Sequence, residues 1–127
     1  MEEKIIEKKM RDITEITERI CELKRESQRL QQIIKNTQKN ETIYMEITLD
    51  QKRNQIAISL LTIIQNQNEI RTVSEITNLR TYFENHSNRM QQVLIFTSKH
   101  EPVYMKAFLE DLCDRASINE LNWVLNS

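Results

Sequence analysis

Glycine is absent from this chain of 127 residues, and proline occurs once, at Pro102. Glycine normally forms left-handed turns, phosphate-binding loops and close backbone approaches to a cofactor. Its absence excludes the P-loop, the dinucleotide-binding fingerprint and the glycine-based nucleophile elbow. Helix ends must then be formed by asparagine, the next residue to tolerate the left-handed conformation. This composition favours an all-α protein.

Cysteine and histidine are scarce as well. Cys21 and Cys113 lie far apart in the sequence and match neither a disulfide framework nor a metal-binding pattern. His86 and His100 have no cysteine or carboxylate at ligand spacing. We therefore expect no metal site and no cofactor. The parts of a Cys-His-acid triad can be distant in sequence, but no local context marks a nucleophile, so we predict that the protein is not an enzyme.

Acidic residues gather once near the carboxyl end, where Glu110, Asp111 and Asp114 lie close to Arg115. General acid and base chemistry is one interpretation of such a cluster. A solvated helix face with local ion pairs is the interpretation that we favour. We also expect Cys113, four residues after Leu109, to be a buried core thiol.

The charge of the chain is nearly balanced, with a formal net charge of −1. Nucleic-acid binding needs clustered lysine and arginine, whereas the basic residues here alternate with glutamates. The uncharged window 54–68 is too short and too rich in amides to span a bilayer, so we expect no membrane partner. The cysteine usage and the lack of a signal peptide favour a reducing compartment, either cytoplasm or nucleus.

Residues 2 to about 39 carry a heptad pattern of apolar side chains. Isoleucine occupies most of the a positions and isoleucine or leucine most of the d positions, as in Ile6, Ile13, Ile16, Ile20, Leu23, Leu30 and Ile34. Lys9, Ser27 and Thr37 interrupt the pattern. Such a pattern favours a two-stranded coiled coil. A helix of this length would reach roughly 55 Å, so part of it should contact another chain or stand out as an arm. The alternative is an amphipathic helix folded back on its own bundle.

The most apolar stretch of the chain runs from Ile56 to Ile64. On a helix, its apolar side chains cover well over half of the circumference, and only Ser59 and Thr62 share the remaining arc. A helix of this kind must be buried on more than one side. A buried strand is the rival interpretation, but no tight-turn signal flanks the run, so we predict a central helix.

Helix boundaries follow from capping signals. Thr48 with Gln51, Thr72 with Glu75 and Ser117 with Glu120 match the capping box and predict helices that begin near 49, 73 and 118. A further helix should begin at Pro102. The third helix, 73 to about 98, should bury an apolar set from Val73 to Phe96. Residues 42–49 alternate like a strand, but without a second strand to pair with we favour helix or linker there.

These observations predict an all-α protein: a long N-terminal coiled-coil helix (1–40) followed by a bundle of three to four helices (41–127). We interpret it as an oligomeric adaptor, scaffold or regulatory subunit, forming a homodimer or hetero-oligomer through the N-terminal helix. The alternative is a small chaperone or inhibitor, of a secretion system or a virus, that offers a groove to one client. The single tryptophan, Trp123, either closes the core or marks a docking surface.

Overall fold

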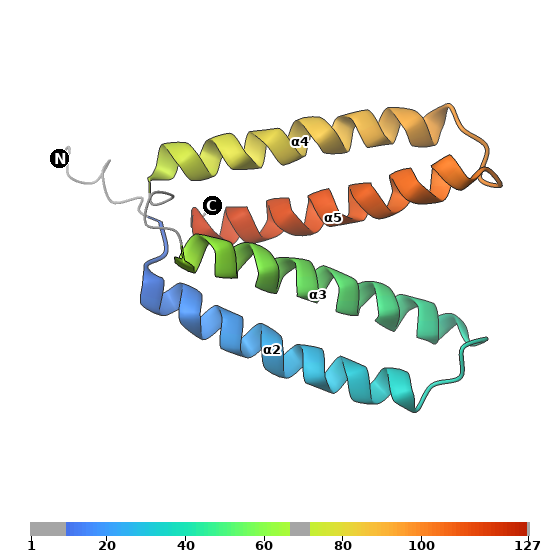
Figure 1. The fold of residues 1–127 in the computed structure, drawn as a ribbon, viewed down its shortest axis with the longest axis horizontal. Helices are drawn as coiled ribbons and strands as arrows, with labels where there is room; N and C mark the ends of the chain where they lie inside the picture. The colour runs from blue at the N-terminus through green and yellow to red at the C-terminus, as the bar shows by residue number, and fades with distance from the viewer. Residues whose placement is uncertain (1–9, 67–71, 127) are drawn as a thin grey trace.

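The computed structural model describes residues 10–66 and 72–126, and over these residues the chain is helical without strands. The four helices are α2 (Ile13–Lys35), α3 (Thr42–Asn66), α4 (Val73–Ile95) and α5 (Pro102–Val124) (Figure 1). The predicted all-α fold with a helical bundle is therefore confirmed. The predicted helix over 56–64 is confirmed as well, as the second half of α3.

The helix ends follow from local chemistry. Asp12 caps α2 and Thr72 caps α4, each through a capping box completed by the glutamate three residues later. Pro102 stands in the first turn of α5, where its missing N–H costs nothing. Beyond α5, Asn126 adopts a positive φ of 63°, the left-handed conformation that glycine would otherwise supply.

The helices form two antiparallel hairpins, α2 with α3 and α4 with α5, and α3 packs beside α5 where the hairpins meet. Figure 1 shows the two hairpin turns at the same end of the molecule, with the hairpins diverging toward that end. The core lies toward the opposite end. It draws on every described helix, through Ile16, Ile20, Leu23, Ala57, Leu60, Leu61, Ile64, Ile76, Leu121, Val124 and Leu125.

The two hairpins are copies of one sequence pattern. The first residues of α2 and α4 are sixty positions apart, and so are those of α3 and α5. Several residues are identical at this offset, and the segment Thr37–Met45 shares five of its nine residues with Thr97–Met105. A fixed offset that matches both residues and helix bounds is the signature of an internal repeat.

The copies share contacts as well as residues. In each turn, a glutamate carboxylate accepts a hydrogen bond from the backbone N–H three residues before it, from Gln38 to Glu41 and from Ser98 to Glu101. Between the helices of each hairpin, a serine hydroxyl donates to the side chain of the facing helix, from Ser27 to Gln51 and from Ser87 to Asp111. Each hairpin is therefore built in the same way.

The long N-terminal coiled-coil helix is not seen. Within the described residues, α2 spans 23 residues, or roughly 35 Å, because the capping box of Asp12 starts it at Ile13. Ile6 lies outside the described residues. Residues 42–49, whose alternation resembled a strand, are the first two turns of α3.

Two predicted capping boxes are wrong. Thr48 lies inside α3, where its hydroxyl donates to the carbonyl of Tyr44. Ser117 lies inside α5 and donates to the carbonyl of Cys113, so the expected short last helix is the end of one continuous helix. Threonine and serine can bond the carbonyl four residues earlier when the helix continues through them.

The predicted set of buried residues on α4 included two that are exposed. Val73 exposes 49 % of its surface and Phe96 exposes 81 %, and α4 ends at Ile95 rather than near 98. Both residues lie at helix termini. The neighbouring hairpin reaches neither, so their apolar character does not lead to burial.

Candidate interaction surfaces

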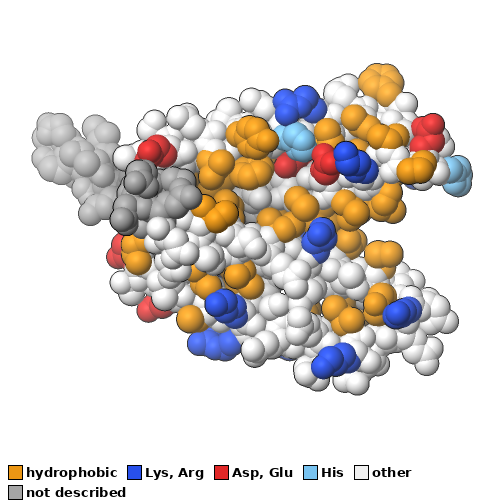
Figure 2. All heavy atoms as spheres, in the orientation of Figure 1, with side chains coloured by type: hydrophobic (Ala, Val, Ile, Leu, Met, Phe, Trp, Pro, Cys, Tyr) orange, Lys and Arg blue, Asp and Glu red, His pale blue; other side chains and the backbone are white. Residues whose placement is uncertain are grey.

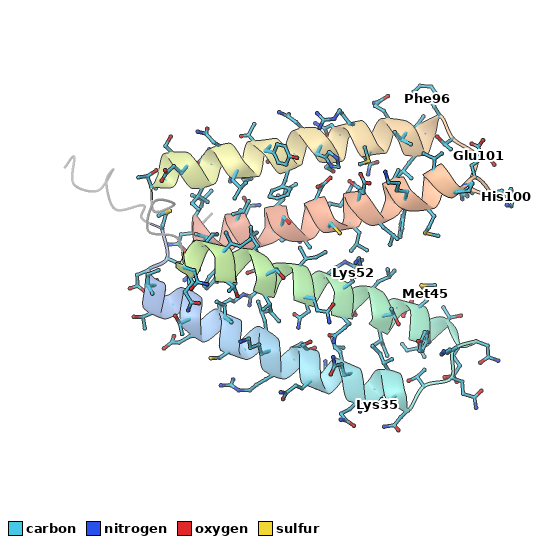
Figure 3. The ribbon with its side chains drawn as sticks, viewed as in Figure 1. Lys35, Met45, Lys52, Phe96, His100 and Glu101 are labelled. Carbon is cyan, nitrogen blue, oxygen red and sulfur yellow. The ribbon has the colours of Figure 1, made fainter. Side chains whose placement is uncertain are left out.

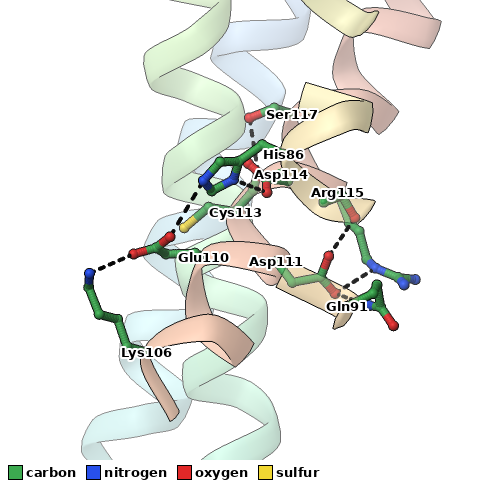
Figure 4. A network of polar contacts seen from close by, with 10 residues as sticks. His86, Gln91, Lys106, Glu110, Asp111, Cys113, Asp114, Arg115 and Ser117 are labelled. Carbon is green, nitrogen blue, oxygen red and sulfur yellow. Dashed lines mark hydrogen bonds and ion pairs between the residues drawn. The ribbon is translucent and has the colours of Figure 1, made fainter. Parts of the chain in front are cut away.

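A seam of polar contacts joins α4 to α5 near the middle of both helices (Figure 4). Its centre is Asp111, which is 7 % exposed. The carboxylate accepts hydrogen bonds from Ser87, from Gln91 Nε2 at 2.7 Å and from Arg115 Nε at 2.9 Å. The acidic cluster was expected on a solvated face, and this expectation is wrong for Asp111, because α4 supplies donors that sequence spacing alone does not reveal.

Asp114 lies one turn further along α5 and is also buried. Its Oδ2 is 2.6 Å from His86 Nδ1, and the other ring nitrogen of His86 lies 3.6 Å from Glu110. Burial raises the pKa of the Asp114 carboxyl, while the hydrogen bond from His86 acts in the opposite direction. His86 thus lies between two carboxylates of α5.

The seam is poorly suited to covalent chemistry. Cys113 is half-buried, and burial raises the pKa of its thiol, whereas a nucleophilic cysteine needs a lowered one. In the described ranges, no three side chains from His, Cys, Asp and Glu come together as a possible metal site. The acidic groups are occupied by donors within the bundle. We therefore attribute the seam to helix pairing.

The stripe of apolar residues on α2, which the heptad pattern predicted, packs inside the bundle. Ile16, Ile20 and Leu23 belong to the core, and Leu30 is buried beside α3. Of the remaining predicted contact residues, Ile13 is 41 % exposed and Ile34 is half-buried. Burial of this stripe therefore requires no second chain, which is the arrangement expected for a helix folded back on its own bundle.

Trp123 is half-buried at the end of α5. The guanidinium groups of Arg11 and Arg19 lie 4.8 and 5.4 Å from the centre of its indole ring. Arg11 Nε also donates to the Trp123 carbonyl at 3.1 Å. Cation–π contacts of this kind tie α5 to the start of α2. The indole is thus covered by groups of the same chain.

A hollow of about 290 Å³ lies along one side of α3. All of its lining residues come from this helix, and we call them the α3 groove: Lys52, Gln55, Ile56, Ser59, Leu60 and Ile63. Ile63 exposes 49 % of its surface there. Figure 3 shows Lys52 between α3 and α5, and the ammonium group makes no ion pair with any residue that the structure describes. The groove thus combines apolar surface with an available cation.

The face of α5 that is equivalent to the α3 groove by the repeat lies on the other side of the molecule. There, Glu120 stands where α3 has Leu60, and Trp123 stands where α3 has Ile63. Arg19 reaches across from α2 and holds Glu120 with two hydrogen bonds, at 3.1 and 2.8 Å. Arg19 thus crosses one end of the α5 face, and Ala116, Asn119 and Glu120 of that face line a hollow of about 270 Å³ between α2, α3 and α5. The α3 groove keeps its apolar residues in the equivalent positions.

A second apolar surface lies at the hairpin turns. Most of the large apolar side chains with high exposure are on or beside these turns, including Ile43, Met45, Ile95, Phe96, Val103 and Met105, which we call the tip surface. Figure 2 shows apolar side chains on both hairpins at this end, with a notch between them. Exposed apolar residues gathered in this way indicate an interaction site.

Searches against protein families, curated proteins and solved structures found no match to this chain. Among the described helices, none is both long and apolar enough to cross a membrane.

The α3 groove and the tip surface were not predicted from the sequence. For the tip surface, the signal in the sequence is the repeat, because Met45 and Met105 occupy equivalent positions and both are exposed, at 58 % and 54 %.

Proposed function

We propose that the protein is a non-enzymatic adaptor or regulatory subunit, and that the α3 groove receives an amphipathic helix of a protein partner. The observation that carries the proposal is the apolar strip of half-buried Ile56 and exposed Ile63 on α3, a helix whose other apolar residues over 56–64 belong to the core or pack against it. Helix-in-groove recognition uses such strips, with apolar anchors spaced one or two turns apart. Lys52 at one end of the groove would favour an acidic residue at the matching end of the partner helix.

The absence of enzymatic activity remains part of the proposal. It is supported by the raised pKa of the Cys113 thiol and by the enclosure of Asp111 and Asp114 within the bundle. The runner-up from the sequence, a chaperone or inhibitor with one client, would use the same groove. The two differ in assembly, because an adaptor of the oligomeric kind contains more than one copy of this chain.

Site-specific photo-crosslinking tests the proposal, and the repeat supplies its control. A photoreactive residue at Ser59, which is exposed in the groove, should crosslink to one defined protein in cells that express this chain. The same residue at Asn119, the equivalent exposed position on α5, should not. Ile63→Glu should abolish the Ser59 crosslink, because a carboxylate in an apolar contact is not compensated.

The identity of the crosslinked protein separates the two versions. A second copy of this chain supports the oligomeric adaptor, and a different protein supports the client-binding form. Equal labelling from Ser59 and Asn119, or a Ser59 crosslink that survives Ile63→Glu in a protein with unchanged circular dichroism, would contradict the proposal.

A further inference from the structure

The tip surface combines projecting apolar side chains with hollows. Phe96 exposes 81 % of its surface, the largest fraction among the large apolar residues that the structure describes. Figure 2 shows apolar side chains on both sides of the notch between the hairpins. A hollow of about 100 Å³ lies beside the second turn, and Val93 of α4 and Val103 and Ala107 of α5 are among the residues that line it. A surface with both features can provide both halves of a contact between two copies.

Both tips carry the same exposed apolar residues. Met45 corresponds to Met105 and Ile43 to Val103 at the offset of the repeat, and all four are exposed. A two-fold axis between two copies makes every contact occur twice. If the first tip of each copy lies against the second tip of the other, each of the two contacts brings equivalent residues together. The repeat therefore suits a symmetric pair of chains.

The charges at this end of the molecule are balanced. The tips carry three exposed lysines and three exposed glutamates, none with an ion-pair partner among the described residues: Lys35, Lys39, Lys99, Glu41, Glu46 and Glu101. A surface of a single sign would repel its own copy, whereas equal numbers of both signs allow lysines of one copy to approach glutamates of the other. The charges therefore fit a second copy better than they fit a partner of high net charge.

The exposed apolar area is sufficient for a dimer. The six side chains of the tip surface expose between 47 % and 81 % of their area. With roughly 200 Å² for a fully exposed side chain of this size, their coverage removes at most about 700 Å² from each copy. Stable interfaces bury about 600–1,000 Å² per partner. Phenylalanine and methionine are also enriched in the buried centre of such interfaces.

We propose that two copies of this chain associate through their tip surfaces about a two-fold axis, with the first tip of each copy against the second tip of the other. Because both turns lie at the same end of the molecule, the two contacts form together (Figure 1). The hollow beside Val103 then receives an apolar side chain from the first tip of the other copy. The α3 groove takes no part in this contact, so the inference stands or falls separately from the proposed function.

Sedimentation of the full chain at about 1–200 μM tests the inference, and the wild type should be dimeric at the upper end of this range. Phe96→Ser/Met105→Ser should raise the Kd of the dimer at least about tenfold, and Met45→Ser should raise it several-fold, because each substitution acts twice in a two-fold dimer. Tyr82→Ser is the matched control. Tyr82 exposes 58 % of its surface but lies about 20 Å along α4 from the tip, so this variant should associate like the wild type.

Lys39→Glu/Lys99→Glu tests the balance of charge. It makes the tips acidic and should weaken the dimer, more at low salt than at about 0.5 M salt, where repulsion between copies is screened. Circular dichroism checks that each variant stays folded. A wild type that remains monomeric at about 200 μM overturns the inference, and so do tip variants that dimerise as well as Tyr82→Ser. A dimer that Ile63→Glu dissociates and the tip variants do not would place self-association in the α3 groove instead.

Discussion

At the scale of residues, the most informative contact is the ion pair between Arg19 and Glu120. Glu120 is 5 % exposed, and its carboxylate depends on Arg19 for both of its described hydrogen bonds. The repeat offers a natural comparison, because the equivalent positions hold Leu79 and Leu60. Leu60 is in the core, and Leu79 packs against it. The same pair of positions in the repeat is therefore occupied once by an ion pair and once by two leucines.

Arg19→Ala should lower the free energy of unfolding by about 1.5–3 kcal/mol, because it leaves a buried carboxylate without its donor. The double variant Arg19→Leu/Glu120→Leu, which copies the other hairpin, should be nearly neutral, since apolar pairs commonly replace buried ion pairs without loss. Urea unfolding measures both. A double variant as unstable as Arg19→Ala would show that the charges themselves are required.

Asp114 makes stability depend on pH. Its folded-state pKa is raised above the ordinary value of 3.8, so the folded chain keeps this proton to a higher pH than the unfolded chain. The free energy of unfolding should therefore fall as the pH rises from about 3.8 through the folded-state pKa. Asp114→Asn, which copies Asn54 of the first hairpin, should flatten this part of the profile. Urea unfolding at a series of pH values tests this, and an unchanged slope would contradict it.

At the scale of elements, the capping assignments can be tested against each other. Thr72→Ala should lower the free energy of unfolding by about 1 kcal/mol, because the Thr72 hydroxyl accepts the hydrogen bond from the Glu75 amide at the start of α4. Thr48→Ala and Ser117→Ala should lower the free energy of unfolding by less than about half of that amount, or should raise it, since alanine has a higher helix propensity than threonine or serine. Thermal unfolding of the three variants compares them directly. An equal loss of stability in Thr48→Ala and Thr72→Ala would contradict the continuous α3 and would support a helix that begins near 49.

The helices themselves were largely readable from the sequence. The absence of glycine, the Thr72 capping box and Pro102 predicted the all-α class and the starts of α4 and α5. Other boundaries failed, because Thr48 and Ser117 fit a capping box by spacing alone while the helix continued through them. The alternation in 42–49 resembled a strand because Ile43 and Met45 are exposed at the hairpin tip, so their apolar character does not report a buried face.

The polar seam could not be predicted in the same way. The burial of Asp111 depends on Ser87 and Gln91 of another helix, and their proximity follows from the hairpin rather than from any local pattern. Similarly, the heptad of α2 identifies an apolar stripe but carries no information on whether the same chain or a second chain covers it.

At the scale of the whole molecule, α2 is part of the core and not an arm. Ile16 and Ile20 share the core with Leu61 of α3 and Leu121 of α5. A chain of residues 41–127, the bundle expected from the sequence to be a separate unit, should therefore lose cooperative unfolding, because removal of α2 exposes the apolar face of α3. Circular dichroism with urea tests this. A cooperative transition near that of the full chain would make residues 41–127 an independent domain.

The central claim is that one chain supplies the whole bundle, with α2 folded back onto α3 and α5. Methyl NOE spectra of the labelled protein should show contacts from Ile16 and Ile20 to Leu61 and Leu121. In a mixture of labelled and unlabelled chains, isotope-filtered spectra should show none of these contacts between chains. Filtered NOEs that join Ile20 to a methyl group of another chain would contradict the account and would place the stripe of α2 in an intermolecular coiled coil.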